Sequence, residues 1–174
     1  MLMDKVMRLF VILLFSVLGL FFVSFSASED KVFAEVGTGV DIGNRAASFS
    51  LLTLDGKEIE LESFAKDKVT LLVFGTTWCP SCRHEIPLLK EYYSEFKDEG
   101  LNVLGIDIQE SVKKVKSLAD KNKINYPVVL DSKAVAARLY KVVGIPLNIV
   151  LDRDGIIVYK ANKPPEKEFL KKLL

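Results

Sequence analysis

The pattern of apolar and polar positions changes several times along the chain, and each change predicts an element. Two short apolar segments, residues 49–54 and 59–61, flank an Asp-Gly pair, which is typical of a β-hairpin. Residues 69–74 and 101–108 are then apolar with little alternation, as expected for strands buried on both faces of a parallel sheet. The pattern therefore predicts a hairpin followed by two central strands.

A helix is predicted between these two strands. Ile86, Leu89, Tyr93 and Phe96 recur at helical spacing and would form its buried stripe, and Gly100 would end it. A strand that leads directly into a helix, which then leads into a second strand, is typical of a parallel βαβ unit.

The rest of the chain predicts the elements that complete the sheet. A lysine-rich helix is expected over residues 111–122, with Val112, Val115 and Leu118 facing inward. There follow a strand at 126–130, a short helix at 132–141, a second hairpin built from 147–151 and 156–159, and a closing helix at 166–174. Strands alternating with helices, with antiparallel pairs at the ends, predict an α/β three-layer sandwich.

The N-terminal residues have the pattern of a targeting segment. Basic residues in the first eight positions precede a nearly continuous apolar run over residues 9–25. Signal-peptide cores span ~7–15 residues and membrane spans about 17–25, so residues 1–27 are predicted as a cleaved signal peptide or a retained membrane anchor. The basic flank would keep the N-terminus in the cytoplasm and place the following domain on the exported, oxidising side. Residues 28–47, polar and glycine-containing, are predicted as a linker, and residues 48–174 as the folded domain.

Composition excludes one class of partner. The chain has 174 residues and a formal net charge of +1, so it lacks the strong basic excess of nucleic-acid-binding proteins. With 49% hydrophobic residues, it is long enough for one domain with a full core and an N-terminal extension. No nucleic-acid partner is expected.

The candidate chemistry lies at the start of the predicted helix. Cys79 and Cys82 are the two cysteines of the chain and follow the buried strand 69–74. Residues three apart on a helix have Cβ atoms about 5–6 Å apart, close enough for a disulfide. The positive end of the helix dipole would stabilise a Cys79 thiolate. We therefore expect a thiol–disulfide redox pair, with Cys79 as the accessible nucleophile and Cys82 as the resolving thiol behind it.

Other uses of the two cysteines are less well supported. A structural disulfide across so few residues would restrict the unfolded chain little. A metal site needs about four ligands, and His84 is the single histidine. Haem attachment requires a histidine directly after the second cysteine, where Arg83 stands. No metal and no cofactor is expected.

The motifs around the pair resemble a known family. The sequence Phe-Gly-Thr-Thr-Trp-Cys-Pro-Ser-Cys-Arg-His-Glu-Ile-Pro at 74–87, with the segments 126–131, 140–146 and 151–155, resembles the TlpA/ResA-like branch of the thioredoxin superfamily. Its members are exported or membrane-anchored thiol–disulfide oxidoreductases. The resemblance covers residues 45–174 and implies a thioredoxin-like fold with an N-terminal β-hairpin and a helical insertion before Tyr126.

The resemblance also implies roles for individual residues. Pro146 would follow a cis bond and face the cysteines, and the backbone of Ile145 would pair with an extended substrate. The alternative is an ordinary trans-proline that opens an edge strand. Trp78 would pack beside the pair and contact substrate, although an aromatic side chain can also simply belong to the core.

Glu85 matches a glutamate of the membrane-anchored members. The helical period places it about 60° from Cys82, where a partly buried carboxylate could exchange a proton with that thiol. The alternative is a solvated carboxylate. Ordinary thioredoxins have a buried aspartate on the preceding strand, where this chain has Val73, so a proton relay would have to come from elsewhere. Leu147 and Asn148 also depart from the small hydroxyl residues frequent after that proline.

The predicted function is reduction of disulfides in exported proteins, with electrons from a membrane-bound donor. Apocytochrome c, during cytochrome c maturation, is the substrate class that the resemblance implies. One alternative is a peroxiredoxin-type peroxidase, for which Thr76 fits but Leu72 stands where proline is needed. The other is a non-enzymatic Cu(I) carrier, although methionine occurs only at positions 1, 3 and 7. The expected location is the periplasmic or extracytoplasmic side of the cytoplasmic membrane, anchored or secreted.

Overall fold

The computed structural model describes residues 36–174. The predicted signal peptide or anchor at 1–27 lies outside the described residues, as does the first part of the predicted linker. In the described part of the chain, no helix is both long and apolar enough to cross a membrane.

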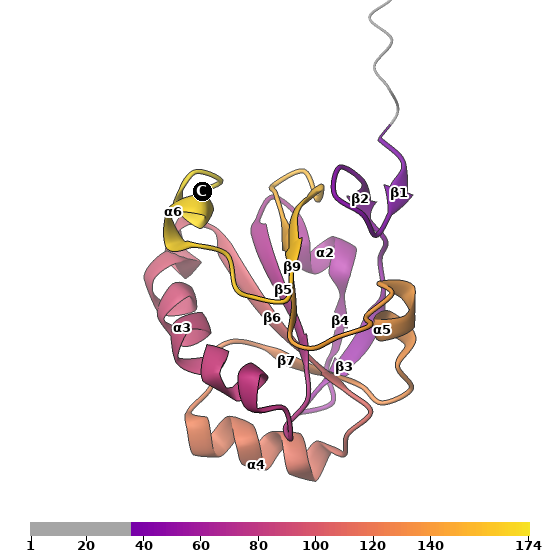
Figure 1. The fold of residues 1–174 in the computed structure, drawn as a ribbon, viewed down its shortest axis with the longest axis vertical. Helices are drawn as coiled ribbons and strands as arrows, with labels where there is room; N and C mark the ends of the chain where they lie inside the picture. The colour runs from indigo at the N-terminus through magenta and orange to yellow at the C-terminus, as the bar shows by residue number, and fades with distance from the viewer. Residues whose placement is uncertain (1–35) are drawn as a thin grey trace, which may run out of the picture. The chain divides into compact units, whose positions relative to one another are not determined.

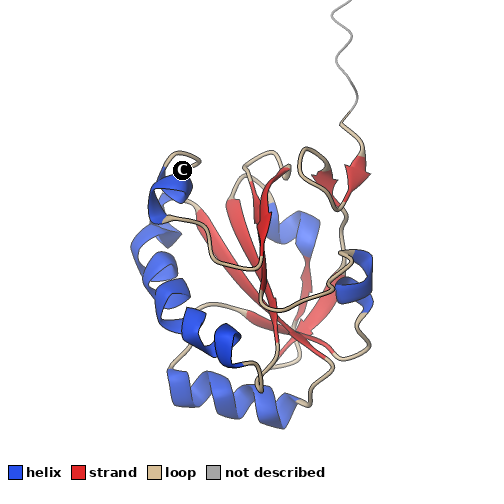
Figure 2. Ribbon diagram, viewed as in Figure 1, coloured by secondary structure: helices blue, strands red, loops and turns tan. Residues whose placement is uncertain are grey.

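The strands of residues 36–174 form a seven-stranded mixed sheet and a separate two-stranded pair (Figures 1 and 2). The sheet order is β4-β3-β7-β6-β5-β8-β9. The bounds are β3 Ser50–Thr53, β4 Glu58–Glu60, β5 Val69–Gly75, β6 Leu101–Ile108, β7 Val128–Asp131, β8 Leu147–Leu151 and β9 Ile157–Ala161. The helices are α2 Leu61–Ala65, α3 Pro80–Phe96, α4 Val112–Asn122, α5 Val135–Leu139 and α6 Lys167–Lys171.

The pairing of the strands confirms the predicted arrangement. β5 pairs in parallel with β6, and β6 in parallel with β7, while β8 runs antiparallel to β5. The hairpins β3–β4 and β8–β9 form the two edges. β5 is buried over its first six residues, as its apolar sequence requires.

Helices cover both faces of the sheet, which gives the three layers expected of a thioredoxin-like fold. Alternate residues of β5 point to opposite faces. Leu72 and Phe74 pack in one core cluster with residues of α2 and α5, and Leu71 and Val73 pack in another with residues of α3 and α6. Figure 1 shows α3 and α6 to the left of the sheet, α4 below it and α5 to its right.

The redox helix α3 begins and ends close to the predicted residues. Cys79 is its N-cap, Pro80 occupies the first helical position, and a short 3₁₀ turn carries the chain to Gly100. The predicted buried stripe is wrong at one position, because Tyr92 is buried and Tyr93 is only half-buried.

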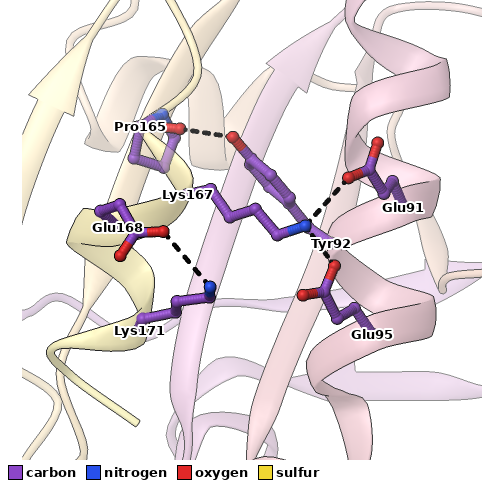
Figure 3. Close-up of polar contacts among 7 residues, drawn as sticks. All are labelled: Glu91, Tyr92, Glu95, Pro165, Lys167, Glu168 and Lys171. Carbon is purple, nitrogen blue, oxygen red and sulfur yellow. Dashed lines mark hydrogen bonds and ion pairs between the residues drawn. The ribbon is translucent and has the colours of Figure 1, made fainter.

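The packing of α6 against α3 explains this difference (Figure 3). The Tyr92 hydroxyl donates a hydrogen bond to the carbonyl of Pro165 at 2.9 Å. Lys167 forms ion pairs with Glu91, at 3.1 Å, and with Glu95. The C-terminal segment thus covers the side of α3 that carries Tyr92, a contact between distant parts of the chain that helical spacing alone cannot reveal.

The predicted inward face of α4 is wrong at one of its three residues, Val112. Val115 is buried and Leu118 half-buried, but Val112 is 48% exposed. Val112 is the first residue of α4, directly after the N-cap Ser111, and lies one turn before the buried Val115.

The predicted linker boundary at residue 47 is wrong. β1, Thr38–Gly39, and β2, Arg45–Ala46, pair in parallel within the stretch predicted as linker. The amide of Gly43 donates to the carbonyl of Ile157 at 2.8 Å, and the side chain of Val40 is buried in the core. These residues attach mainly through backbone hydrogen bonds, which leave no hydrophobic period in the sequence. The folded domain therefore begins before residue 48.

Candidate active site

Cys79 and Cys82 form a disulfide at the N-terminus of α3, as the spacing predicts. Their Cα atoms lie 5.3 Å apart. β5 delivers the chain to this point, and the turn at residues 76–78 carries it into the helix. The backbone amide of Cys82 donates a hydrogen bond to Cys79 Sγ at 3.1 Å. The same amide can stabilise the Cys79 thiolate once the disulfide is opened.

In the disulfide form, the predicted nucleophile Cys79 is covered. Cys79 is only 5% exposed, whereas Cys82 is half-buried. Cys79 Sγ lies 4.0 Å from the carbonyl oxygen of Ile145, so the loop before β8 helps to cover it.

That loop contains the predicted cis bond. The Ile145–Pro146 peptide is cis, and the register of β8 with β5 pairs Leu147 with Phe74, just before the turn that leads to Cys79. Asn162 donates hydrogen bonds to the carbonyls of Pro146, at 2.7 Å, and Gly144, at 3.2 Å. Asn162 thus holds the loop in place, a role that the sequence analysis missed.

A groove runs beside the covered sulfur. Trp78, which is 67% exposed, lines it together with Ile145 and the fully exposed Val143. Arg138 and Lys141 add two positive charges to its wall. Trp78 is therefore a surface residue next to the pair and not part of the core.

Glu85 is half-buried and forms a hydrogen bond within the protein. Asn148 Nδ2 donates to Glu85 Oε2 at 3.1 Å. Burial raises the pKa of Glu85, and this hydrogen bond opposes the rise. The alternative of a freely solvated carboxylate is therefore wrong. The hydrogen-bond partner of Glu85 is Asn148 on β8, not a cysteine.

Two acidic residues near the pair were missed by the sequence analysis. Glu110 accepts hydrogen bonds from the backbone amide of Thr77 and from the Thr77 hydroxyl, the latter at 2.7 Å, and so fixes the turn before Cys79. Asp107 is buried on β6. The sequence signal for Asp107 was a carboxylate inside a mostly apolar predicted strand. An aspartate is rarely buried there without a partner or a function.

His84, on α3, is exposed. Within residues 36–174, no group of three or more histidine, cysteine, aspartate or glutamate side chains is arranged to hold a metal ion.

Comparison with known proteins agrees with this geometry. The chain matches the AhpC/TSA family over residues 42–160. It is 31% identical over 135 residues to the thiol-disulfide oxidoreductase ResA of Bacillus thuringiensis, with 78% of each chain covered. It is 33% identical over 130 residues to the thioredoxin-like protein YneN of Bacillus subtilis, with 73% of this chain and 75% of that protein covered.

Solved structures show the same fold. StoA from Bacillus subtilis superimposes with a TM-score of 0.62 at 28% identity, covering 73% of this chain and 96% of StoA. The thioredoxin domain of a thiol-disulfide oxidoreductase from Bacteroides vulgatus gives a TM-score of 0.67 at 26% identity, covering 77% and 96%. The chain therefore belongs to the AhpC/TSA family and is a thioredoxin-fold thiol–disulfide oxidoreductase of the ResA type.

Proposed function

We propose that this oxidoreductase reduces disulfides in exported proteins. The observation that carries the proposal is the position of Cys79. Its sulfur lies at the N-cap of α3, accepts a hydrogen bond from the Cys82 amide and lies 4.0 Å from the Ile145 carbonyl. A thiolate stabilised in this way is a good nucleophile toward a disulfide held along the loop.

The reaction proceeds by two exchanges. The Cys79 thiolate attacks one sulfur of the substrate disulfide, and the other substrate sulfur leaves as a thiolate. Cys82 then loses its proton and attacks Cys79 Sγ, which forms the Cys79–Cys82 disulfide and releases the second substrate thiolate. Two electrons pass from the dithiol to the substrate, and the pair must be reduced again by a donor.

The surrounding residues take the roles that the resemblance implies. The backbone around Ile145 and Pro146 would pair with an extended substrate segment, and the exposed ring of Trp78 offers an apolar contact beside it. Glu85, half-buried on α3, would exchange a proton with the cysteine pair.

The location follows from the N-terminal sequence. We propose that residues 1–27 export or anchor the protein, so that the folded domain works on the outer side of the cytoplasmic membrane. A membrane-bound donor would then supply electrons across the membrane. The substrates would include apocytochrome c, whose haem-site cysteines must be reduced before haem is attached.

The reduction potential of the pair tests the proposed direction. Equilibration with glutathione should give a strongly negative value, toward the ~−270 mV of thioredoxin, whereas a value near the ~−120 mV of a strong oxidant would overturn the proposal. Turnover of an insulin-like disulfide should depend on Cys79, and a Cys82→Ser variant should accumulate the mixed disulfide with the substrate. Lys97→Ser on the exposed 3₁₀ turn is a matched control and should retain activity.

A further inference from the structure

A cavity of about 70 Å³ lies between the sheet and the helices α3 and α4. Cys82 lines it from α3, Asp107 from β6 and Tyr126 from the segment before β7. α4 contributes Val115 and Leu118, which make its wall apolar. The cavity is large enough to hold a water molecule. The second cysteine of the pair and the Asp107 carboxyl group therefore line the same pocket.

One carboxylate oxygen of Asp107 is buried without a hydrogen-bond partner within residues 36–174. The residue is 7% exposed, and Oδ1 has no hydrogen-bond partner among the described residues. A buried carboxyl oxygen without a partner is costly, so its presence in a central strand calls for a reason other than packing. Asp131, a comparable buried aspartate on β7, accepts hydrogen bonds from the amides of Val135 and Ala137.

The register of the sheet brings Asp107 next to the Cys82 sulfur. Asp107 pairs with Gly75 on the neighbouring strand β5. A Cβ atom placed on Gly75 would lie 3.2 Å from Cys82 Sγ, so the sulfur rests on this glycine. The sulfur contacts Gly75, and Asp107 lies directly across from Gly75 on the adjacent strand. Adjacent strands are about 4.8 Å apart.

The charged and titratable groups around Asp107 favour its protonated form. Burial raises the pKa of Asp107 to about 8, and the charge of neighbouring Glu110 and a side-chain hydrogen bond with it act in the same direction. Because the reference pKa of a thiol is ~8.5, a carboxyl group with a pKa raised this far is suited to exchange a proton with a thiol in either direction. Arg83 and Tyr126 also line the cavity, while the lining residues of α4 and β5 carry no charge.

We infer that Asp107 is a second proton-exchange group for Cys82 and serves it from the buried side, across this cavity. The inference rests on the proposed role of Cys82 as the resolving thiol, but not on the direction of electron flow. When the disulfide closes, Cys82 gives its proton to Asp107, directly or through one water, in the fraction of molecules in which that carboxyl group is ionised. The Cys82 thiolate then bonds to Cys79 Sγ, the bond from Cys79 to the substrate sulfur breaks, and that sulfur leaves with the electron pair. When a thiolate opens the disulfide at Cys79, Cys82 leaves as a thiolate and takes the proton back from Asp107.

Asp107→Asn tests this role. The reduced protein is mixed with a small coloured aromatic disulfide, and the second, concentration-independent release of coloured thiolate reports closure by Cys82. We expect closure in Asp107→Asn to be slower by at least about tenfold at pH 7. This is less than general acid–base catalysis usually contributes, because Glu85 can still exchange a proton with Cys82. The ultraviolet absorbance of the thiolates should at the same time show a lower pKa for Cys82, because a neighbouring negative charge has been removed.

The combination distinguishes proton exchange from a structural role. A more acidic thiol would by itself close faster at neutral pH, so slower closure together with a lower thiol pKa requires the loss of a proton acceptor. Asp107→Glu, which keeps a carboxyl group, should close at nearly the wild-type rate. Asp120→Asn, an exposed aspartate on α4, should behave as wild type. An unchanged closure rate or an unchanged Cys82 pKa in Asp107→Asn would overturn the inference.

A measurement on the wild-type protein keeps the test valid if Asp107→Asn does not fold. The titration of the Asp107 carboxyl carbon, followed by NMR, should shift when the pair is reduced, because a titrating thiol then faces it. The same titration in both redox forms would contradict the inference. None of these readouts depends on the reduction potential, so they stay informative even if the protein works as an oxidant.

Discussion

Asn148 donates a hydrogen bond from Nδ2 to Glu85 Oε2 at 3.1 Å and thereby joins strand β8 to the redox helix α3. Asn148 is fully buried and pairs in register with Val73, the position where ordinary thioredoxins have an aspartate. A buried amide on β8, next to Val73, thus holds a carboxylate of the redox helix.

Removal of this hydrogen bond should make Glu85 a weaker acid. The bond from Asn148 lowers the pKa of Glu85 against the effect of burial, so Asn148→Leu should raise that pKa further. NMR titration of the Glu85 carboxyl carbon would measure the change. Asn102→Leu is a matched control, because Asn102 lies on β6 and donates instead to the carbonyl of Phe64. A Glu85 pKa that stays the same or falls in Asn148→Leu would show that the hydrogen bond does not control this carboxyl.

The local parts of this fold could be predicted from the sequence. Hairpins, buried strands and the position of Cys79 at the start of a helix all follow from residues close together in the chain. What could not be predicted depends on contacts between distant segments. Tyr92 is buried because α6 packs on it, and the stretch around Val40 is ordered because its backbone pairs with the β9 region.

The candidate site divides in the same way. The cysteine pair and the cis-proline follow from motifs, whereas the nearness of Asp107 to Cys82 depends on how β6 registers with β5. A single aspartate in an apolar strand carries no sign of the residue that it will face. The groups that shift the pKa values of a site therefore remain hidden until the strands are paired.

The stability of the disulfide form should decrease between about pH 4 and pH 8 because of Asp107. Its pKa is raised from 3.8 to about 8 in the folded protein, so the folded state holds this proton more tightly than the unfolded chain does. The stabilisation is fully present below pH ~4 and is lost as the pH rises toward 8. Urea unfolding of wild type and Asp107→Asn across this range should show a flatter pH dependence in the variant. Parallel pH profiles would mean that Asp107 titrates normally in the folded state.

Trp78 should contribute to the binding of protein substrates but not to the chemistry of the pair. Its exposed ring lines the groove beside Ile145, so Trp78→Ala should raise the KM for a protein disulfide about three- to tenfold, in line with the loss of one exposed apolar contact. The rate with a small aromatic disulfide should change little. Val135→Ala, which removes an exposed apolar side chain outside the groove, is the control. Equal losses on both substrates would instead place Trp78 in the reaction itself.

The contact between α3 and α6 should matter for stability only. Tyr92→Phe removes the hydroxyl that donates to Pro165 and leaves the buried ring, so the free energy of unfolding should fall by about 0.5–1.5 kcal/mol. Tyr93→Phe, at a half-buried position on the same helix, should cost less. The reduction potential and the rate of disulfide exchange should be unchanged in both variants. A shift in potential would reveal a coupling along α3 that the contacts do not suggest.

The family match raises the question of peroxide chemistry, and the site predicts that this chain consumes peroxide poorly. Thr76 fits the peroxidase pattern, but Leu72 stands where that pattern has proline, and the Ile145 carbonyl lies 4.0 Å from Cys79 Sγ. The groove beside it is lined by Trp78 and Val143, which suit an extended polypeptide better than a small polar oxidant. Peroxide consumption by the reduced protein should therefore be no faster than that of Cys79→Ser, whereas turnover of an insulin-like disulfide should be abolished in that variant. Peroxide turnover comparable to disulfide turnover, lost in Cys79→Ser, would make the peroxidase reading the better one.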